Sequence, residues 1–209
     1  MPAKVVCISR ALGADGAEVG RIVSDRLGYR LVDEEIVAEA ADRGMVDTDL
    51  VANAEERRSL ARRILDELIW TSTVTVTPEI GPAEFSSEPH RELIIAVIRE
   101  TAERGEAVIV AHAASHALAG RPDVLRVLVT ASPEVRARRL AAAQQVDESR
   151  GPALVRESDA ARAAYFKDFY GMAAELPTQY DLVINTDVLT PEEAAELVVA
   201  AARFGLRGR

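Results

Sequence analysis

The chain has 209 residues, of which 48% are hydrophobic and 28% are charged, and its formal net charge is −9 at pH 7. This length and mixture predict one compact domain rather than a disordered chain, and the acidic balance argues against a general nucleic-acid binder, which would present a basic face. No apolar run approaches the roughly 20 residues of a membrane span and the N-terminus lacks a signal-peptide pattern, so we expect a cytoplasmic protein without a membrane partner.

Strand-length apolar runs alternate with stretches of helical period along the chain. The runs that predict strands are residues 4–9, 29–33, 106–111, 124–130 and 180–186. The stretches that predict helices are residues 17–28, 34–44, 47–70 (one or two helices), 90–105, 114–120, 132–145, 159–176 and 190–205. Prolines and β-branched residues in 71–89 predict a loop or a short strand. Continuous apolar strands between helices indicate a parallel sheet covered on both faces.

Several helix ends carry their own sequence signals. Gly28, Gly44 and Gly105 follow predicted helices at the position where glycine ends a helix in the left-handed conformation. Ser132-Pro133 and Thr190-Pro191 each place a capping hydroxyl before a proline at the first helical position. The single cysteine, Cys7, lies in the first apolar run, and we interpret it as a small core residue rather than a reactive thiol.

The loop after the first strand has the layout of a phosphate-binding loop without its usual side chains. A Walker-type loop, G-x-x-x-x-G-K-[ST], uses lysine for the phosphates and a hydroxyl for magnesium. This loop has neither, and it carries Asp15 and Glu18 where an anion should bind, with Arg10 and Arg21 as the expected counter-charges. Backbone N–H groups at a helix N-terminus hold phosphate without side chains, so the loop indicates either an unusual nucleotide enzyme or the remains of one.

Positive charge is concentrated in residues 126–167, where eight arginine and lysine residues outnumber five acids. In an acidic protein, this local excess favours a compact anionic ligand. The alternative is a solvated helix with ion pairs between residues one turn apart. The residues alone leave both interpretations open.

Four blocks of the sequence resemble the cytidylate kinases, and in particular the cytidylate-kinase-like group. Residues 124–141, VLRVLVTASPEVRARRLA, resemble a strand ending in T-A-S-P-E and the arginine-rich helix after it. Residues 180–198, YDLVINTDVLTPEEAAELV, resemble the last strand, which is closed by Asn-Thr, and the helix that follows. Residues 156–171 carry the D-x-x-R-x-x-Y pattern, and residues 8–16 carry the I-S-R-x-x-G-x-x-G opening.

This resemblance implies a nucleoside-monophosphate-kinase domain over residues 1–209. Its fold would be a P-loop NTPase-like, three-layer α/β fold with a five-stranded parallel sheet. Residues 46–87 would form the helical insertion that binds the nucleoside monophosphate, and residues 142–160 would form the lid region. ATP and Mg²⁺ are the implied cofactors, and nucleotides are the implied small-molecule partners.

The resemblance also implies which residues bind and react. The nucleotide phosphates would be held at Arg10, Gly13, Ala14, Asp15, Gly16, Ala17 and Glu18. The catalytic residues would be Arg150, Arg156, Asp159 and Arg162. The three arginines would bind the transferred phosphate, because a planar guanidinium group donates two hydrogen bonds to phosphate oxygens. Asp33 and His112 would contact the substrate. No residue is assigned as a metal ligand.

Several of these residues have a structural alternative. Asp33 suits the N-cap of a helix. Asp15 or Glu18 is a candidate magnesium ligand in place of the missing hydroxyl, and the alternative for Glu18 is an acid favoured by the helix dipole. Arg162 would otherwise form a surface pair with Asp159. The aromatic residues within 165–170 either stack on a nucleobase or pack in the core.

Two positions depart from the pattern of the resembling group. Ala17 stands where that group often has an arginine, and residues 111–113 read Ala-His-Ala in place of Gly-Arg-Gly. Arg136 and Arg139, on the helix after the fourth strand, are expected to be structural or to anchor the lid.

Two classes of function follow. The first is an ATP-dependent kinase for a nucleoside monophosphate, with cytidylate as the implied acceptor and another small acceptor as a weaker option. The second is an inactive descendant that senses a nucleotide or binds a protein through the same cleft. The apolar segment 62–76 favours a homodimer if it is not buried in the core.

Overall fold

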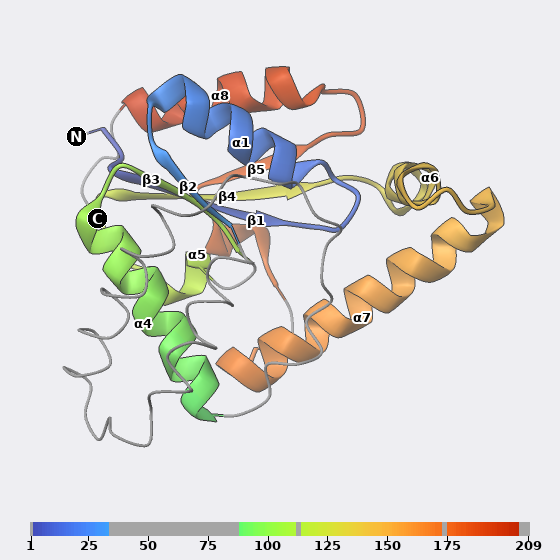
Figure 1. Ribbon diagram of the computed structural model, residues 1–209, viewed down its shortest axis with the longest axis horizontal. Helices are drawn as coiled ribbons and strands as arrows, with labels where there is room; N and C mark the ends of the chain where they lie inside the picture. The colour runs from blue at the N-terminus through green and yellow to red at the C-terminus, as the bar shows by residue number, and fades with distance from the viewer. Residues whose placement is uncertain (1, 34–87, 112–113, 173–174, 205–209) are drawn as a thin grey trace.

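The computed structural model describes residues 2–33, 88–111, 114–172 and 175–204. At its centre is a parallel sheet of five strands in the order β2-β3-β1-β4-β5 (Figure 1). The strands are β1 (Val5–Arg10), β2 (Arg30–Asp33), β3 (Ala107–Val110), β4 (Val124–Thr130) and β5 (Leu182–Asn185). The sheet confirms the predicted α/β fold class. The predicted insertion, residues 46–87, lies outside the described residues.

Helices cover both faces of the sheet, as Figure 1 shows. One face carries α1 (Gly16–Leu27) and α8 (Pro191–Phe204), and the other carries α4 (Glu88–Arg104) and the short α5 (Ala114–Ala117). Each layer encloses its own cluster of buried aliphatic side chains. No helix among the described residues is long and apolar enough to cross a membrane.

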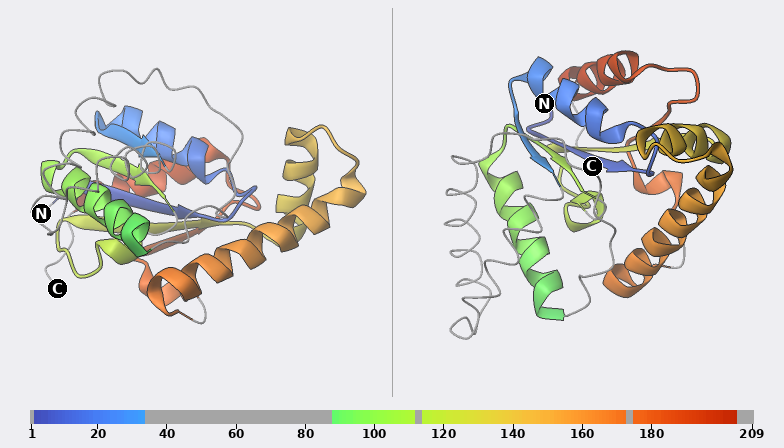
Figure 2. Two further views of the ribbon diagram at one scale, coloured as in Figure 1. Left: turned by 60° about the horizontal axis from the view of Figure 1, so that its bottom comes forward. Right: turned by 45° about the vertical axis from the view of Figure 1, so that its right-hand side comes forward.

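A helical hairpin stands at the carboxyl end of the sheet (Figure 2). It consists of α6 (Pro133–Ala143), a 3₁₀ turn at Glu148–Arg150 and the long helix α7 (Gly151–Tyr170). The sequence predicted a polar turn up to residue 158, whereas α7 begins at Gly151. Pro152 is a local signal for a first turn that the sequence-based prediction did not use. The tertiary contact is that of Gly151, which lies so close to the carbonyl of Ala137 that a side chain there would collide with α6.

The central strand β1 is buried along its whole length. It pairs with β3 on one side and β4 on the other, so its alternate side chains enter the two core clusters. Cys7 is fully buried, and burial raises the pKa of its thiol to about 12. This confirms that Cys7 is a core residue, because a thiol with such a pKa is not a nucleophile at neutral pH.

The local signals for helix ends are confirmed wherever the structure describes them. Gly28 and Gly105 both have a φ of +69° at the ends of α1 and α4. The Ser132 hydroxyl accepts a hydrogen bond from the Val135 N–H at 3.4 Å. Thr190 and Glu193 cap α8 reciprocally, each side chain accepting from the other's backbone N–H at 3.2 and 2.9 Å. Gly44 lies outside the described residues.

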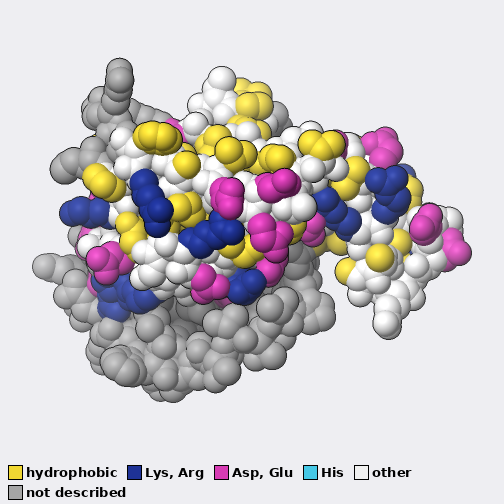
Figure 3. Space-filling view, turned by 90° about the horizontal axis from the view of Figure 1, so that it is seen from above, with side chains coloured by type: hydrophobic (Ala, Val, Ile, Leu, Met, Phe, Trp, Pro, Cys, Tyr) yellow, Lys and Arg dark blue, Asp and Glu magenta, His cyan; other side chains and the backbone are white. Residues whose placement is uncertain are grey.

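The face formed by α1 and α8 carries acidic and basic side chains in alternation (Figure 3). Arg21 pairs with Asp25 at 2.9 Å within α1, and Arg26 pairs with Glu196 across the two helices at 3.4 Å. On this face, acidic and basic side chains are therefore mixed rather than gathered by sign.

Candidate functional site

The loop between β1 and α1 closes over two residues in the left-handed conformation. Gly13 has a φ of +79° and Asp15, the N-cap of α1, has a φ of 59°. The Asp15 side chain makes no capping hydrogen bond, so no side chain occupies the N–H groups of the first turn at that position. Ala14 between them is fully buried, and its N–H donates to the Ala11 carbonyl at 3.0 Å.

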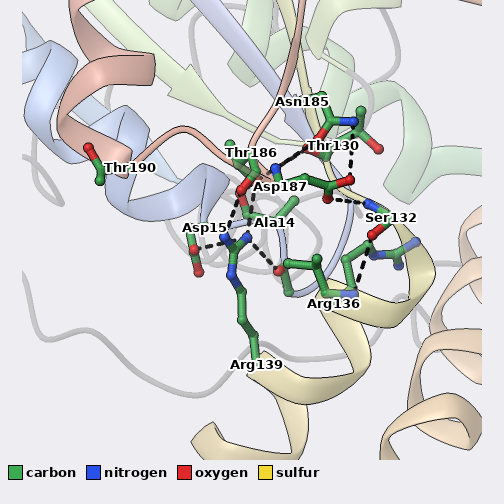
Figure 4. Close-up of polar contacts among 12 residues, drawn as sticks. Ala14, Asp15, Thr130, Ser132, Arg136, Arg139, Asn185, Thr186, Asp187 and Thr190 are labelled. Carbon is green, nitrogen blue, oxygen red and sulfur yellow. Dashed lines mark hydrogen bonds and ion pairs between the residues drawn. The ribbon is translucent and has the colours of Figure 1, made fainter.

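Three successive carbonyls of this loop accept hydrogen bonds from α6 and from Thr186, the residue after β5; Figure 4 labels the donors Arg136, Arg139 and Thr186. Arg136 Nε donates to the Leu12 oxygen at 2.7 Å, Arg139 Nη1 to the Gly13 oxygen at 3.4 Å, and Thr186 Oγ1 to the Ala14 oxygen at 3.1 Å. Because a trans peptide is planar, the N–H groups of Gly13, Ala14 and Asp15 lie opposite these carbonyls. The Ala14 N–H already donates to the Ala11 carbonyl within the loop. The loop is therefore anchored to α6 and Thr186 through its carbonyl oxygens.

The two acids, Asp15 and Glu18, each form an ion pair with an arginine of this chain. Asp15 Oδ2 lies 3.1 Å from Arg139 Nη1, and Glu18 Oε1 lies 2.6 Å from Arg21 Nη2. The hydrogen bond from Arg21 holds the pKa of Glu18 below its usual value. Arg21 confirms the predicted counter-charge for Glu18. Asp15 pairs with Arg139 rather than with Arg10, which sequence spacing did not indicate because Asp15 and Arg139 are far apart along the chain.

Arg10 supports the loop from the end of β1. Its side chain is 9% exposed and lies against Gly16, where a β-carbon would come within 2.5 Å of the Arg10 β-carbon. A glycine is therefore needed at position 16 for packing. Arg10 also links β1 to α7, since its carbonyl accepts a hydrogen bond from Arg162 Nη1 at 2.8 Å.

Arg162 joins α7 to the carboxyl end of β1 through a buried network. Its Nε and Nη2 donate to the two oxygens of Glu175 at 2.9 and 2.8 Å, and Nη2 also donates to Ser9 Oγ at 2.8 Å. The Tyr180 hydroxyl donates to the same Glu175 carboxylate. The side chains of Arg162 and Glu175 are only 11% and 17% exposed, so this ion pair is largely removed from solvent.

Asp159 binds a different arginine from the one that the sequence suggested. Its carboxylate receives Arg136 Nη2 at 2.6 Å and Nη1 at 3.1 Å, which ties α7 to α6. The alternative of a surface pair between Asp159 and Arg162 is therefore wrong. Asp159 pairs with Arg136, and Arg162 pairs with Glu175. Arg136 has the structural role expected for it.

Arg150 and Arg156 lie on the outer part of the hairpin and are exposed. Neither forms an ion pair with another residue in the part of the chain that the structure describes. Their guanidinium groups thus differ from those of Arg136 and Arg162, whose donors already have acceptors. Their assignment to the transferred phosphate stays a prediction.

One of the two predicted substrate residues, Asp33, lies at a strand end that the structure describes. Asp33 ends β2 and stands opposite Val110, the last residue of β3, so it lies at the carboxyl edge of the sheet. His112 lies outside the described residues. Tyr165 and Phe166 are 9% and 2% exposed, which confirms core packing rather than a free stacking surface for these two aromatic side chains.

Phe166 belongs to an aromatic cluster around His116. The His116 ring lies 5.1 Å from Phe166, 5.4 Å from Tyr170 and 6.2 Å from Tyr180, and the Arg162 guanidinium lies 4.9 Å from the Phe166 centroid. Burial, and then the charges of Arg126 and Arg162, lower the pKa of His116. This aromatic cluster packs against Arg162 through Phe166.

Whether the described residues could hold Mg²⁺ depends mainly on the carboxylates near the loop. Among the described residues, no three His, Cys, Asp or Glu side chains gather as a metal site. Asp15 and Glu18 are the loop carboxylates, and each is in an ion pair. Mg²⁺ usually takes one or two carboxylates and several phosphate or water oxygens, so an ion here would depend mainly on the phosphates of a bound nucleotide.

Two curated proteins share modest identity with part of the chain. The cytidylate kinase of Sulfurisphaera tokodaii is 27% identical over 124 residues, which cover 59% of this chain and 68% of that protein. The cytidylate kinase of Methanoculleus marisnigri is 28% identical over 103 residues, which cover 49% of this chain and 56% of that protein. The chain thus spans little more than half the length of the second relative.

Solved structures share the fold across nearly the whole chain. An uncharacterized protein from Eubacterium ventriosum aligns with a TM-score of 0.69 and 17% identity, covering 96% of this chain and 98% of that one. Shikimate kinase from Bacteroides thetaiotaomicron aligns with a TM-score of 0.53 and 16% identity, covering 95% and 98%. At this level of identity, the likeness establishes the P-loop kinase fold alone.

The model of the cytidylate kinase-like family matches residues 5–188. The match includes every strand of the sheet, the loop before α1 and the complete α6–α7 hairpin. With the four sequence blocks and the observed strand order, it shows that this chain belongs to the cytidylate kinase-like family.

Proposed function

We propose that the protein transfers a phosphoryl group from ATP to a nucleoside monophosphate, with cytidylate as the acceptor. The observation that carries the proposal is the loop at the end of the central strand. Its carbonyls accept hydrogen bonds from α6 and from Thr186, and the first turn of α1 has no side-chain cap. Such a helix N-terminus favours phosphate through its free N–H groups and its dipole.

Phosphoryl transfer needs positioning and compensation of charge more than covalent help. In the proposed complex, the backbone from Gly13 to Glu18 binds the ATP phosphates, and Arg10 packs against that loop at Gly16. Arg150 and Arg156 approach the transferred phosphate from the lid region, residues 142–160. Their exposed guanidinium groups have the planar donor geometry that suits phosphate oxygens.

Arg162 would act from the end of β1. Its bonds to Ser9 and to the Arg10 carbonyl place a buried positive charge beside the strand end from which the loop departs. In the described state its charge is balanced by Glu175. Asp33, at the same edge of the sheet, and His112 are proposed to face the acceptor. Magnesium would neutralise the phosphates of ATP when bound.

Titration calorimetry with ATP, with and without Mg²⁺, is the first experiment because it requires no choice of acceptor. Micromolar binding by the wild type, weakened at least tenfold by Gly13→Val, would support the proposal, since a β-carbon at residue 13 would lie 2.9 Å from the Arg136 carbonyl oxygen. Gly120→Val is the matched control, because Gly120 also has a positive φ but has no neighbour within 4 Å. Phosphorylation of cytidylate would then be compared with that of other nucleoside monophosphates and small acceptors.

A non-catalytic nucleotide sensor or protein scaffold is the second candidate. The observation in its favour is that the loop lacks lysine and a hydroxyl while both of its acids are paired internally. ATP binding without phosphorylation of any monophosphate would select this candidate. Absence of ATP binding at millimolar concentration would exclude the kinase. The homodimer through segment 62–76 stays a prediction, and light scattering would test it.

A further inference from the structure

Arg139 reaches the phosphate loop from the middle of α6. Its Nη1 lies 3.1 Å from Asp15 Oδ2 and donates to the Gly13 carbonyl at 3.4 Å and to Thr186 Oγ1 at 3.1 Å. Its Nη2 donates to the Thr186 carbonyl at 2.7 Å. Figure 4 shows the side chain extended from α6 towards Asp15 and Thr186. A permanent positive charge is therefore fixed against a loop whose own sequence has no lysine.

The contact of Arg139 with Thr186 is buried, whereas its contact with Asp15 is partly exposed to solvent. Thr186 is fully buried, and its hydroxyl also donates to the Ala14 carbonyl at 3.1 Å and to the Thr130 carbonyl at 3.3 Å. The side chains of Arg139 and Asp15 are 29% and 35% exposed. An incoming anion could thus reach the guanidinium without disturbing the bonds that position it.

Two other arginines close to the loop, Arg136 and Arg162, differ from Arg139 in this respect. Arg136 is 6% exposed, and its donors bind Asp159 and the Leu12 carbonyl. Arg162 is 11% exposed and binds Glu175, Ser9 and the Arg10 carbonyl. Either would have to break a buried ion pair before it met a ligand, and removing one partner from such a pair is costly.

We propose that Arg139 supplies the cation that the loop lacks, and that Asp15 holds this cation until a phosphate oxygen replaces its carboxylate. Asp15 is then an internal competitor of the nucleotide: it neutralises Arg139 in the free protein and lowers the affinity for phosphate. The proposal rests on the proposed function, since it assigns the residues that bind the phosphates at that site. The exchange involves hydrogen bonds and charge only.

The test compares three variants with the wild type for binding of inorganic tripolyphosphate and of ATP by calorimetry at low and high salt. Asp15→Asn replaces the carboxylate by an uncharged amide of the same size, and asparagine is tolerated at positive φ. We therefore expect this variant to bind both ligands about fivefold more tightly than the wild type. Arg139→Ala should bind at least about tenfold more weakly, and Arg139→Lys should be intermediate because it loses the paired donors.

Two neighbouring substitutions serve as matched controls. Asp25→Asn removes one negative charge from the same helix, where Asp25 pairs with Arg21 at 2.9 Å and lies away from the loop. Arg138→Ala removes an exposed positive charge from the residue beside Arg139. Both should change the affinities less than twofold. Urea unfolding of each variant verifies the fold, and the expected gain for Asp15→Asn cannot arise from misfolding.

The outcomes separate this inference from the proposed function. Binding of ATP that is unchanged or weakened in Asp15→Asn, or unaffected in Arg139→Ala, would overturn the inference and leave the nucleotide site standing. Tripolyphosphate binding that depends on Arg139 without ATP binding would support the inference and reject the kinase. Absence of binding of either anion to the wild type and to Asp15→Asn would reject both.

Discussion

The inner and outer parts of the α6–α7 hairpin differ in what their arginines do. At the inner part, Arg136, Arg139 and Arg162 are bonded to backbone carbonyls and to carboxylates of other elements. At the outer part, Arg150 and Arg156 are exposed and form no ion pair within the described residues. The same residue type thus builds the site in one region and remains available to a ligand in the other.

The comparison shows that local charge is a poor guide to the role of an arginine in this protein. The excess of positive charge in residues 126–167 suggested either an anionic ligand or a helix with pairs one turn apart. The observed pairs of Arg136, Arg139 and Arg162 reach residues that are 13 or more positions away, so they are tertiary contacts. Part of the excess therefore stabilises the fold, and part is left for binding.

Arg162→Ala should have the largest effect, because it leaves Glu175 and its partners buried without a counter-charge. We expect a loss of about 3–5 kcal/mol in the free energy of unfolding. Arg156→Ala, on the exposed side of the same helix, should change it by less than about 0.5 kcal/mol. Urea unfolding of both variants measures the difference. Equal effects would mean that the inner and outer arginines are not distinct.

Gly13→Ala should have the next largest effect, because the loop packs directly on α6. A β-carbon there would lie 2.9 Å from the Arg136 carbonyl oxygen and 3.0 Å from Leu140 Cγ. Gly120→Ala carries the same penalty for positive φ, about 1–2 kcal/mol, without a contact. We expect Gly13→Ala to cost about 1–3 kcal/mol more, by thermal or urea unfolding. Similar losses in the two variants would argue against tight packing of the loop on α6.

The aromatic cluster beneath Arg162 should make stability depend on pH. Burial and nearby Arg126 and Arg162 hold the pKa of His116 below its ordinary value of 6.5, so the folded state resists protonation more than the unfolded chain does. The stability is fully present above pH 6.5 and is lost as the pH falls through that value towards the lower pKa of the folded state. The slope for one proton is at most about 1.4 kcal/mol per pH unit.

His116→Phe measures this contribution, since phenylalanine keeps a ring beside Phe166 and does not titrate. Urea unfolding between pH 7.5 and 5.5 should show a smaller loss of stability in the variant than in the wild type. The two curves should meet above neutral pH after allowance for a constant offset. Parallel curves over the whole range would show that His116 is not the responsible group.

Glu18→Gln should have the smallest effect, because the pair with Arg21 is exposed. Its two side chains are 42% and 43% exposed, and such helix pairs contribute about 0.3–0.5 kcal/mol at low salt. Unfolding at low and high salt should show a small difference that decreases with salt. A loss of Mg²⁺-dependent ATP binding in this variant would instead favour the role of Glu18 as a metal ligand.

Much of the fold could be predicted because its signals are local. The strand at 124–130 was predicted with the bounds that β4 has, and Ser132-Pro133 marked the start of α6 correctly. The beginning of α7 was missed by eight residues although Pro152 is a local signal for a first turn, whereas nothing in the sequence indicates that Gly151 packs against Ala137. Position in the sheet also placed Asp33 at the carboxyl edge beside β3.

The candidate site could be predicted only in part. The loop between β1 and α1 was recognised from its glycines, and Arg21 was identified as the counter-charge of Glu18 because the two residues are one helical turn apart. Glu175 and Thr186, which hold Arg162 and Arg139, were not identified as site residues. The NT at the end of the last strand was a usable signal for Thr186, whereas no signal in the sequence pointed to Glu175.

The sequence by itself determined the alternation of strands and helices, the helix caps, the buried cysteine and the family. Those properties depend on hydrophobic period, on residues adjacent in the chain and on ordered motifs. Only the tertiary structure decided which carboxylate each arginine meets. An ion pair is selected by the distance between side chains, and the fold brings Arg139 to Asp15 and Arg162 to Glu175 across separations that no local pattern records.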